Sequence, residues 1–442
     1  MRFVLDVTRL VGSDPLAAPP TGIARVELAY IDRFLPHPRT LFVRTTRRMG
    51  LRRVHRSEVE TLVSRIAARW SVEADPAPEL AGIEQRLAES FGLTRIAAFR
   101  QAAAEGDSAA QRLRSHGARA VQLVEGFSRA ALGGNPGIEG LGAHDVYFHV
   151  SHQATDEPHR FRALERSRLR KVFACHDLIP ITYPEYVEPG AREKHCARIA
   201  TVTRLADLVY VISRTTKDDL IAHIEREGLR RPPIVVAPLG LEPTWFREVP
   251  VLRAFEAPAP YFLAVSTIEA RKNHAFLLRL WRELVTAHGD AAPILLIVGK
   301  RGWQVQSASA LLDRCLGFDG HVHELGTVSD AALRVLMGNA AGLLAPSFTE
   351  GFSYPPIEAM LAGRPILASD IGAHREYLTG AARFIAPSDG EGWKRAVMEL
   401  AVDGSAAPRL TADERRRRAA AVSWDAHFSI LADALDADGP LT

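Results

Sequence analysis

Short apolar runs alternate with longer segments of helical spacing along most of the chain. Many runs are rich in Val, Ile and Leu without a polar residue at every second position. Strands of this kind are buried on both faces under helices, which is typical of parallel sheets. The predicted strands are 2–7, 40–45, 146–150, 171–175, 208–212 and 234–237, followed by 261–265, 294–298, 322–325, 342–345, 365–368 and 383–385. The repeated strand-then-helix order predicts an α/β protein with right-handed crossovers.

A proline-rich stretch from Pro238 to Pro260 divides the strands into two series and indicates an interdomain linker. We therefore expect two doubly wound, Rossmann-like domains facing a cleft, over residues 1–245 and 258–408. Residues 409–442 begin with the helix-start pattern Thr411-x-x-Glu414. They are expected to form a C-terminal helix and tail that packs back on the first domain.

The segment 50–142 interrupts the first series, because it has helical spacing and few strand signals. It predicts a helical insertion in the first domain. Its glycine-rich end, 133–142, precedes a strand instead of following one, so it does not match a dinucleotide-binding fingerprint.

Composition and charge narrow the class of protein. The 442 residues are 47% hydrophobic and carry a formal net charge of +3, which argues against a disordered chain and a dedicated nucleic-acid binder. The three cysteines, Cys175, Cys196 and Cys315, form no CxxC pair and favour a reducing cytoplasm. The N-terminal residues turn acidic at Asp6, so no signal peptide is expected. No run of about eighteen apolar residues predicts a membrane-spanning helix.

Candidate chemistry is densest between Pro346 and Met360. Glu350 and Gly351 follow a predicted strand, where ligand crevices of α/β sheets open. Pro355-Pro356 favours a helix start, whose free N–H groups would bind an anion, with Glu358 in its first turn. The alternative is that Glu358 only complements the helix dipole and that Glu350 is a surface loop residue.

Arg271 and Lys272 lie directly after the predicted strand 261–265. Two neighbouring cations at this position can neutralise a diphosphate, Arg through forked hydrogen bonds and Lys as a point charge. A solvated helix N-terminus is the alternative, but the helix dipole opposes cations there. In the first domain, Gly22 opens a predicted helix and His176 follows the strand 171–175. A lone histidine is more often structural.

Together these segments resemble the retaining GT-B glycosyltransferases of family 4, especially mannosyltransferase-like members that build bacterial surface polysaccharide. The resemblance extends from Thr21 to about Trp424, outside the insertion. The matching pieces are Glu350 with Glu358 (Glu-x7-Glu), 271–273 (Arg-Lys-Asn), 298–303 (Val-Gly-Lys-x-Gly-Trp), 176–180 (His-Asp-Leu-Ile-Pro) and 21–23 (Thr-Gly-Ile). The family usually has glycine at the positions of Ser353 and Ser266, both close to the phosphate path that the resemblance implies.

The resemblance implies sugar transfer with retention from a nucleotide-sugar to an acceptor hydroxyl. Arg271 and Lys272 would stabilise the departing nucleoside diphosphate, Glu350 would bind the transferred sugar, and His176 would contact the sugar or acceptor. The implied donor-binding residues are Glu358 at the ribose, Val328 at the base through its main chain, Lys300, and the backbone near Gly22, Gly351, Phe352 and Ser353.

GDP-mannose is the favoured donor by resemblance, and a glycan or lipid-linked saccharide is the expected acceptor. Neither a cofactor nor a metal is expected: the only Asp-x-Asp, at 436–438, lies in the terminal tail. Two other functions remain open from the sequence, a catalytically weak nucleotide-sugar-binding scaffold and a GT-B sugar-nucleotide epimerase. Oligomeric state is not indicated.

A basic segment suggests a membrane contact. Arg44, Arg47, Arg48, Arg52, Arg53 and Arg56 occur with no Asp or Glu among them. If the stretch is helical, Arg48, Arg52 and Arg56 share a face that would attract an anionic leaflet and make the enzyme peripheral on the cytoplasmic membrane. The alternative is a solvated, partly salt-bridged surface.

Overall fold

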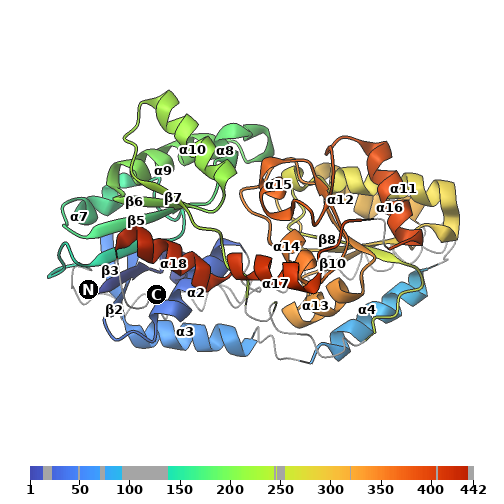
Figure 1. The fold of residues 1–442 in the computed structure, drawn as a ribbon, viewed down its shortest axis with the longest axis horizontal. Coiled ribbons are helices and arrows are strands. Elements are labelled where there is room, and N and C mark those ends of the chain that lie inside the picture. The colour runs from blue at the N-terminus through green and yellow to red at the C-terminus, as the bar shows by residue number, and fades with distance from the viewer. Residues whose placement is uncertain are drawn as a thin grey trace.

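The computed structural model describes residues 1–12, 22–47, 50–69, 75–91, 138–242, 245, 254–318, 320–404 and 407–436. Two sheets with helices on both faces lie side by side (Figure 1). All neighbouring strands in both sheets are parallel except one pair, so the predicted α/β class with two Rossmann-like domains is confirmed.

The first sheet has the order β3-β2-β1-β4-β5-β6-β7. Its strands are β1 (Phe3–Asp6), β2 (Thr40–Thr46), β3 (Gly50–Val54), β4 (Val146–His149), β5 (Arg170–Cys175), β6 (Leu208–Val211) and β7 (Ile234–Val236). The helices around it are α1 (Thr8–Gly12), α2 (Ile23–Phe34), α3 (Arg56–Arg69), α7 (Arg162–Glu165), α8 (Ile179–Thr182), α9 (Ala191–Leu205) and α10 (Arg214–Glu227).

The second sheet has the order β10-β9-β8-β11-β12-β13. Its strands are β8 (Tyr261–Val265), β9 (Ile294–Val298), β10 (Val322–Gly326), β11 (Gly342–Ala345), β12 (Ile366–Ser369) and β13 (Arg383–Ile385). The helices that follow them are α11 (His274–His288), α12 (Gln306–Arg314), α13 (Asp330–Asn339), α14 (Tyr354–Leu361), α15 (Gly372–Leu378) and α16 (Gly390–Val402).

Strand β3 corrects the prediction of helix from residue 50 onward. It pairs antiparallel with β2, and Arg44 lies opposite Arg52. The chain reverses through Gly50, whose φ of 63° is a conformation that glycine adopts without strain. The buried side chains of this strand, Leu51 and Val54, are three residues apart, a spacing that also fits a helix. The apolar pattern therefore could not separate the two structures.

This correction also changes the interpretation of the basic segment, residues 44–56. Arg52 lies on a strand and Arg56 begins α3, so the shared helical face predicted for Arg48, Arg52 and Arg56 is wrong; Arg48 itself lies outside the described residues. The Arg56 guanidinium donates to the carbonyls of Leu35, His37 and Thr40, which ties α3 to the end of α2. Arg56 is thus a structural residue.

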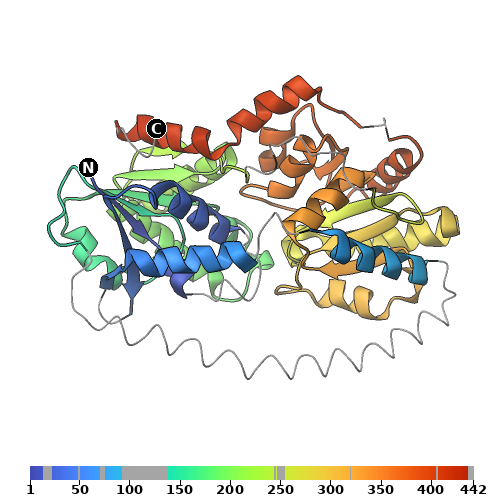
Figure 2. The same cartoon turned by 90° about the horizontal axis from the view of Figure 1, so that it is seen from below.

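The insertion is also divided between the two halves of the molecule. Val59, Leu62 and Ile66 of α3 pack into the core of the first sheet. Helix α4 (Ala77–Ser90), by contrast, packs on the second sheet through Leu80, Ile83 and Leu87 (Figures 1 and 2). The prediction that the whole insertion belongs to the first domain is wrong for α4, because amphipathic spacing shows which face is buried but not against what. Residues 92–137 lie outside the described part of the chain.

The C-terminal helices connect both halves. Helix α17 (Ala412–Ala421) lies against the second half, where Arg418 donates to the carbonyls of Tyr377 and Thr379. Helix α18 (Trp424–Leu435) packs into the core of the first sheet through residues that include Phe428 and Leu431 (Figure 2). Among the described residues, no helix has the length and apolar character required to cross a bilayer.

Replacing Leu87 by Ala tests the placement of α4. Leu87 is fully buried, so Leu87→Ala should lower the free energy of unfolding by about 2–5 kcal/mol. Glu89→Ala, at an exposed position of the same helix, should leave it nearly unchanged. In Leu87→Ala, the backbone amides of α13 and β10 should be the first to lose protection against hydrogen exchange. Loss confined to β1 and β2 would contradict the placement.

Candidate active site

A cavity of about 400 Å³ lies where the carboxyl ends of β8, β9 and β10 face the first turn of α2. Open α/β sheets bind ligands at this edge. Nine of the residues predicted for the site line it: Gly22, Arg271, Lys272, Lys300, Val328, Glu350, Phe352, Ser353 and Glu358. Two predicted residues, His176 and Gly351, are not among the lining residues.

The two predicted cations converge on one buried carboxylate. Arg271 and Lys272 follow β8 in a short 3-10 turn, and Glu350 follows β11. The Arg271 Nη1 lies 2.5 Å from Glu350 Oε2, and the Lys272 ammonium forms an ion pair with Glu350 Oε1. Ser347 Oγ donates to the same Oε1 at 2.7 Å. Glu350 therefore fixes both cations at the wall of the cavity.

A second carboxylate, which the sequence analysis had not assigned, completes this cluster. Glu269 Oε1 lies 2.7 Å from Arg271 Nε, so Arg271 is held between Glu269 and Glu350. Glu269 stands two residues before Arg271 in the sequence. This short separation is the signal that could have identified it as a site residue. Two carboxylates therefore face two cations at the wall of the cavity.

Burial and charge set the ionisation of Glu350. Burial by itself opposes ionisation, but Arg271 and Lys272 outweigh it and lower the pKa of Glu350 to about 2. Burial lowers the pKa of Lys272, and the neighbouring Arg271 acts in the same direction, whereas Glu350 opposes both. The carboxylate is thus the group that keeps the ammonium charged.

Glu358 lies in a different electrostatic environment. Its carboxyl is buried, which raises its pKa to about 7, and Arg25 Nη1 at 4.0 Å only partly offsets the effect of burial. Arg25 comes from α2 of the first half and pairs with Asp330 of α13 at 2.6 Å. This ion pair crosses the cleft. Arg25 and Asp330 were not predicted as site residues, although Arg25 stands three residues after Gly22.

The start of α14 offers fewer N–H groups than its position suggests. Ser353 is the N-cap, and Tyr354, Pro355 and Pro356 form the first turn. Both prolines lack an N–H, so only the backbone near Ser353 and Tyr354 can donate to an anion there. The first-turn anion site inferred from Pro355-Pro356 is therefore reduced, and Arg271 and Lys272 supply most of the positive charge.

Gly351 and His176 meet each other at the contact between the two halves. A Cβ on Gly351 would lie 2.4 Å from the His176 carbonyl oxygen, so the close approach to His176 requires glycine here. The His176 Nε2 lies 2.8 Å from the Val150 carbonyl, and burial lowers the pKa of this histidine. The predicted contact of His176 with sugar or acceptor stays an expectation from the resemblance.

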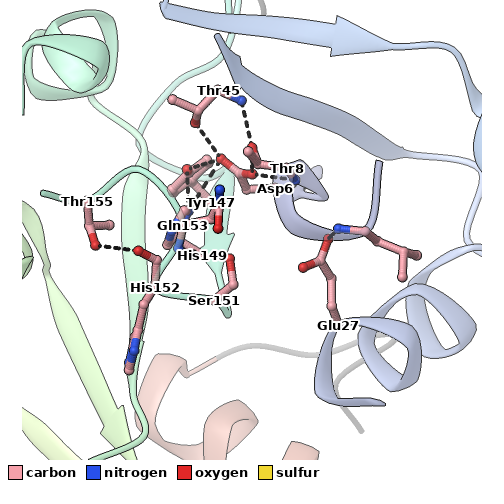
Figure 3. A network of polar contacts seen from close by, with 11 residues as sticks. Asp6, Thr8, Glu27, Thr45, Tyr147, His149, Ser151, His152, Gln153 and Thr155 are labelled. Carbon is pink, nitrogen blue, oxygen red and sulfur yellow. Dashed lines mark hydrogen bonds and ion pairs between the residues drawn. The ribbon is translucent and has the colours of Figure 1, made fainter. Parts of the chain in front are cut away.

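A buried polar network centred on Asp6 lies in the first half (Figure 3). Asp6 accepts hydrogen bonds from Thr45 Oγ1 at 3.0 Å and Tyr147 OH at 2.8 Å, and His149 Nδ1 lies 3.3 Å away. These contacts join the carboxyl ends of β1, β2 and β4. His152, in the loop after β4, accepts from the His176 N–H at 3.3 Å. His152 thereby contacts the loop that carries His176.

Val328 lines the cavity directly after Gly326 and Thr327. Within the described part of the chain, its main-chain N–H and C=O have no hydrogen-bond partner, and the residue is 9% exposed. An unpaired backbone donor and acceptor beside a cavity suit edge-on recognition of a planar heterocycle.

Comparison with solved structures identifies the architecture. Anabaena Alr3699/HepE in complex with UDP superposes with a TM-score of 0.60 at 15% identity, over 99% of this chain and 100% of that chain. Sucrose-phosphate synthase from Thermosynechococcus elongatus gives a TM-score of 0.52 at 20% identity, over 66% and 72% of the two chains. The fold is that of the GT-B glycosyltransferases.

Sequence comparison identifies the second half. Residues 259–403 match the family "Glycosyl transferases group 1", so this half is a domain of that family. "Serotype-specific mannosyltransferase WbdA" of Escherichia coli is 29% identical over 250 residues, which cover 52% of this chain and 30% of WbdA. "O-antigen chain mannosyltransferase RfbU" of Salmonella typhimurium is 32% identical over 143 residues, which cover 32% of this chain and 38% of RfbU. The matched region thus spans about a third of each of these relatives.

Stability against pH distinguishes the two site glutamates. The folded pKa of Glu358, about 7, exceeds the ordinary value, so wild type loses stability as pH rises toward 7. Glu358→Gln should match wild type at pH 4 and exceed it by on the order of 2–3 kcal/mol at pH 8.5. The measurement is urea unfolding of both proteins at the two pH values.

Glu350→Gln should behave in the opposite sense. The folded pKa of Glu350, about 2, lies below the ordinary value, so its stabilisation is present above pH 4.5 and lost as pH falls through 2. The variant should therefore be less stable at neutral pH by about 3 kcal/mol, since two buried cations lose their partner. Equal pH dependence of Glu350→Gln and Glu358→Gln would contradict both assignments.

Proposed function

We propose that the chain is a retaining, metal-independent glycosyltransferase. It moves a sugar, with mannose favoured, from a nucleotide-sugar to a glycan or lipid-linked acceptor in bacterial surface-polysaccharide synthesis. The single observation that carries the proposal is the Arg271–Lys272 pair, held by Glu350 at the wall of the cavity in a glycosyl transferases group 1 domain.

The chemistry of this pair suits a diphosphate leaving group. When the glycosidic bond to the nucleotide breaks, negative charge grows on the phosphate oxygens, and preorganised cations lower that barrier. Arg271 supplies forked hydrogen bonds and Lys272 a compact charge. Because these cations neutralise the leaving group, the proposal needs no metal. Glu350 keeps them in place, and in the proposal it also faces the transferred sugar.

The remaining donor contacts follow from the lining of the cavity. In the proposal the Val328 main chain binds the base and Glu358 the ribose, whose hydroxyls can pair with a carboxyl in either protonation state. Lys300 is exposed at the rim and is available to the phosphates or the sugar. Gly22 and Ser353 contribute backbone from the two sides of the cleft.

The choice of sugar rests on the relatives. WbdA and RfbU are named mannosyltransferases, and RfbU acts on an O-antigen chain. Alr3699/HepE, which shares the GT-B architecture, was solved with UDP and with UDP-glucose. GDP-mannose is proposed as the donor, with UDP-sugars as the competing class.

Contact with an anionic membrane surface is a separate proposal. The β2–β3 hairpin leaves Arg47 and Arg53 exposed, while Arg44 and Arg52 lie opposite each other and are half-buried. The exposed pair provides a smaller basic surface than a continuous helix would have done.

Loss of either cation should remove most of the transfer activity. Arg271→Ala and Lys272→Ala should each slow release of GDP from GDP-mannose, with methyl α-D-mannoside as acceptor, by about 100-fold. Arg375→Ala, at an exposed ion pair with Asp370, is the matched control and should retain full activity. Activity of both cavity variants within about threefold of wild type would refute the clamp.

Nucleotide affinity should separate Glu358 from Glu350. Calorimetry should show that Glu358→Ala weakens GDP binding about tenfold, the effect expected when a hydrogen bond to the ribose is lost. Glu350→Gln should keep GDP affinity, because the bound diphosphate takes over the pairing of Arg271 and Lys272 from the carboxylate, and it should lose turnover. Nucleotide binding without turnover in wild type would favour the scaffold function, and donor turnover that ignores acceptor would favour an epimerase.

A further inference from the structure

Helix α4 reaches the edge of the nucleotide cavity with one acidic side chain. Glu79, in its first turn, accepts a hydrogen bond from the Ser329 N–H at 3.1 Å and another from Ser329 Oγ at 2.6 Å. Ser329 directly follows Val328, which lines the cavity. One carboxylate of the insertion therefore holds the residue next to the proposed base contact.

Ser329 uses all its local hydrogen-bonding capacity in this arrangement. As the N-cap of α13, its Oγ accepts from the Ala332 N–H at 3.1 Å while it donates to Glu79. Its N–H is also bound by Glu79, so both the backbone and the side-chain rotamer are fixed. A carboxylate beside the N-terminus of α13 is favoured by the helix dipole as well.

The packing of α4 makes this contact rigid. Leu80 and Leu87 are fully buried in the core of the second sheet, together with Ala332 and Leu336 of α13. On the other side of the same turn, Asp330 is held by Arg25 of α2. The loop 327–330 is thus clamped by two segments, α4 and α2, that lie before residue 91 in the chain.

We propose that Glu79 is a positioning residue that sets the geometry of the Val328 main chain and thereby the choice of nucleotide base. The inference rests on the proposed function, because it assigns the base to Val328. Recognition by an unpaired backbone N–H and C=O depends on their direction, and a loop free to rotate would accept different bases equally. Glu79 acts on the base through Ser329, whereas Arg271 and Lys272 act on the phosphates.

The test compares three phosphate-containing probes. Affinities for GDP, UDP and inorganic pyrophosphate are measured by calorimetry for wild type, Glu79→Ala, Glu79→Gln and the control Glu89→Ala. Glu89 is exposed on the same helix and pairs with Gln85. Glu79→Ala should weaken the preferred nucleotide about tenfold, reduce the GDP-to-UDP preference, and leave pyrophosphate within about twofold.

Two further readouts exclude a merely structural role. With GDP-mannose, Glu79→Ala should raise KM and leave kcat at saturating donor close to wild type, because the base contact is made before and during the reaction alike. Glu79→Gln should be intermediate, because its amide oxygen can still accept one of the two hydrogen bonds. If Glu79→Ala does not fold, Glu79→Gln against Glu89→Ala carries the comparison.

The outcomes separate the inference from the proposed function. Unchanged GDP and UDP affinities in both Glu79 variants would overturn the inference alone. Equal losses for the nucleotides and pyrophosphate would do the same, since they would indicate general destabilisation. Wild type that binds pyrophosphate but neither nucleotide would overturn the proposed function and the inference together.

Discussion

The arrangement of the site depends on holding two neighbouring cations side by side in a buried cavity. Arg271 and Lys272 repel each other, and burial disfavours both charges. Glu350 resolves this by pairing with both, and Ser347 orients its carboxylate. Because β8 delivers the cations and β11 the carboxylate, the pairing also joins two adjacent strands at the edge where ligands bind. A diphosphate would meet cations that are already charged and oriented.

The cleft is assembled from more of the chain than the second sheet. Arg25 crosses from α2 to Asp330, Gly351 packs against the His176 carbonyl, and Glu79 reaches Ser329 from the insertion. Two of these contacts, from Arg25 and Glu79, meet at the turn before α13. The shape of the cavity therefore depends on both α2 and α4, since a shift of either helix would move the same turn before α13.

Local sequence chemistry predicted much of this structure. Short apolar runs identified twelve strands, many of them unbroken because helices cover both faces of the sheets, and the ends of the strands indicated Arg271, Lys272 and Glu350. Prediction from the local sequence was less reliable where one pattern fits two structures. Leu51 and Val54 suit a helix or a strand, so β3 was missed. Pro355 and Pro356 predicted the start of α14 correctly but remove the N–H groups expected to bind an anion.

The sequence by itself determined the α/β class, the two series of strands and which charged residues stand at strand ends, since these depend on periodicity and on near neighbours. Tertiary structure decided which of those charges meet. Glu269 and Glu350, about eighty residues apart in the chain, both pair with Arg271. Arg25 of the first half pairs with Asp330 of the second half. Helix α4 packs on the second sheet, although it lies in the chain between strands of the first sheet. Amphipathic spacing specifies a buried face without specifying its partner, and a carboxylate takes its pKa from neighbours that only the folded chain brings within reach.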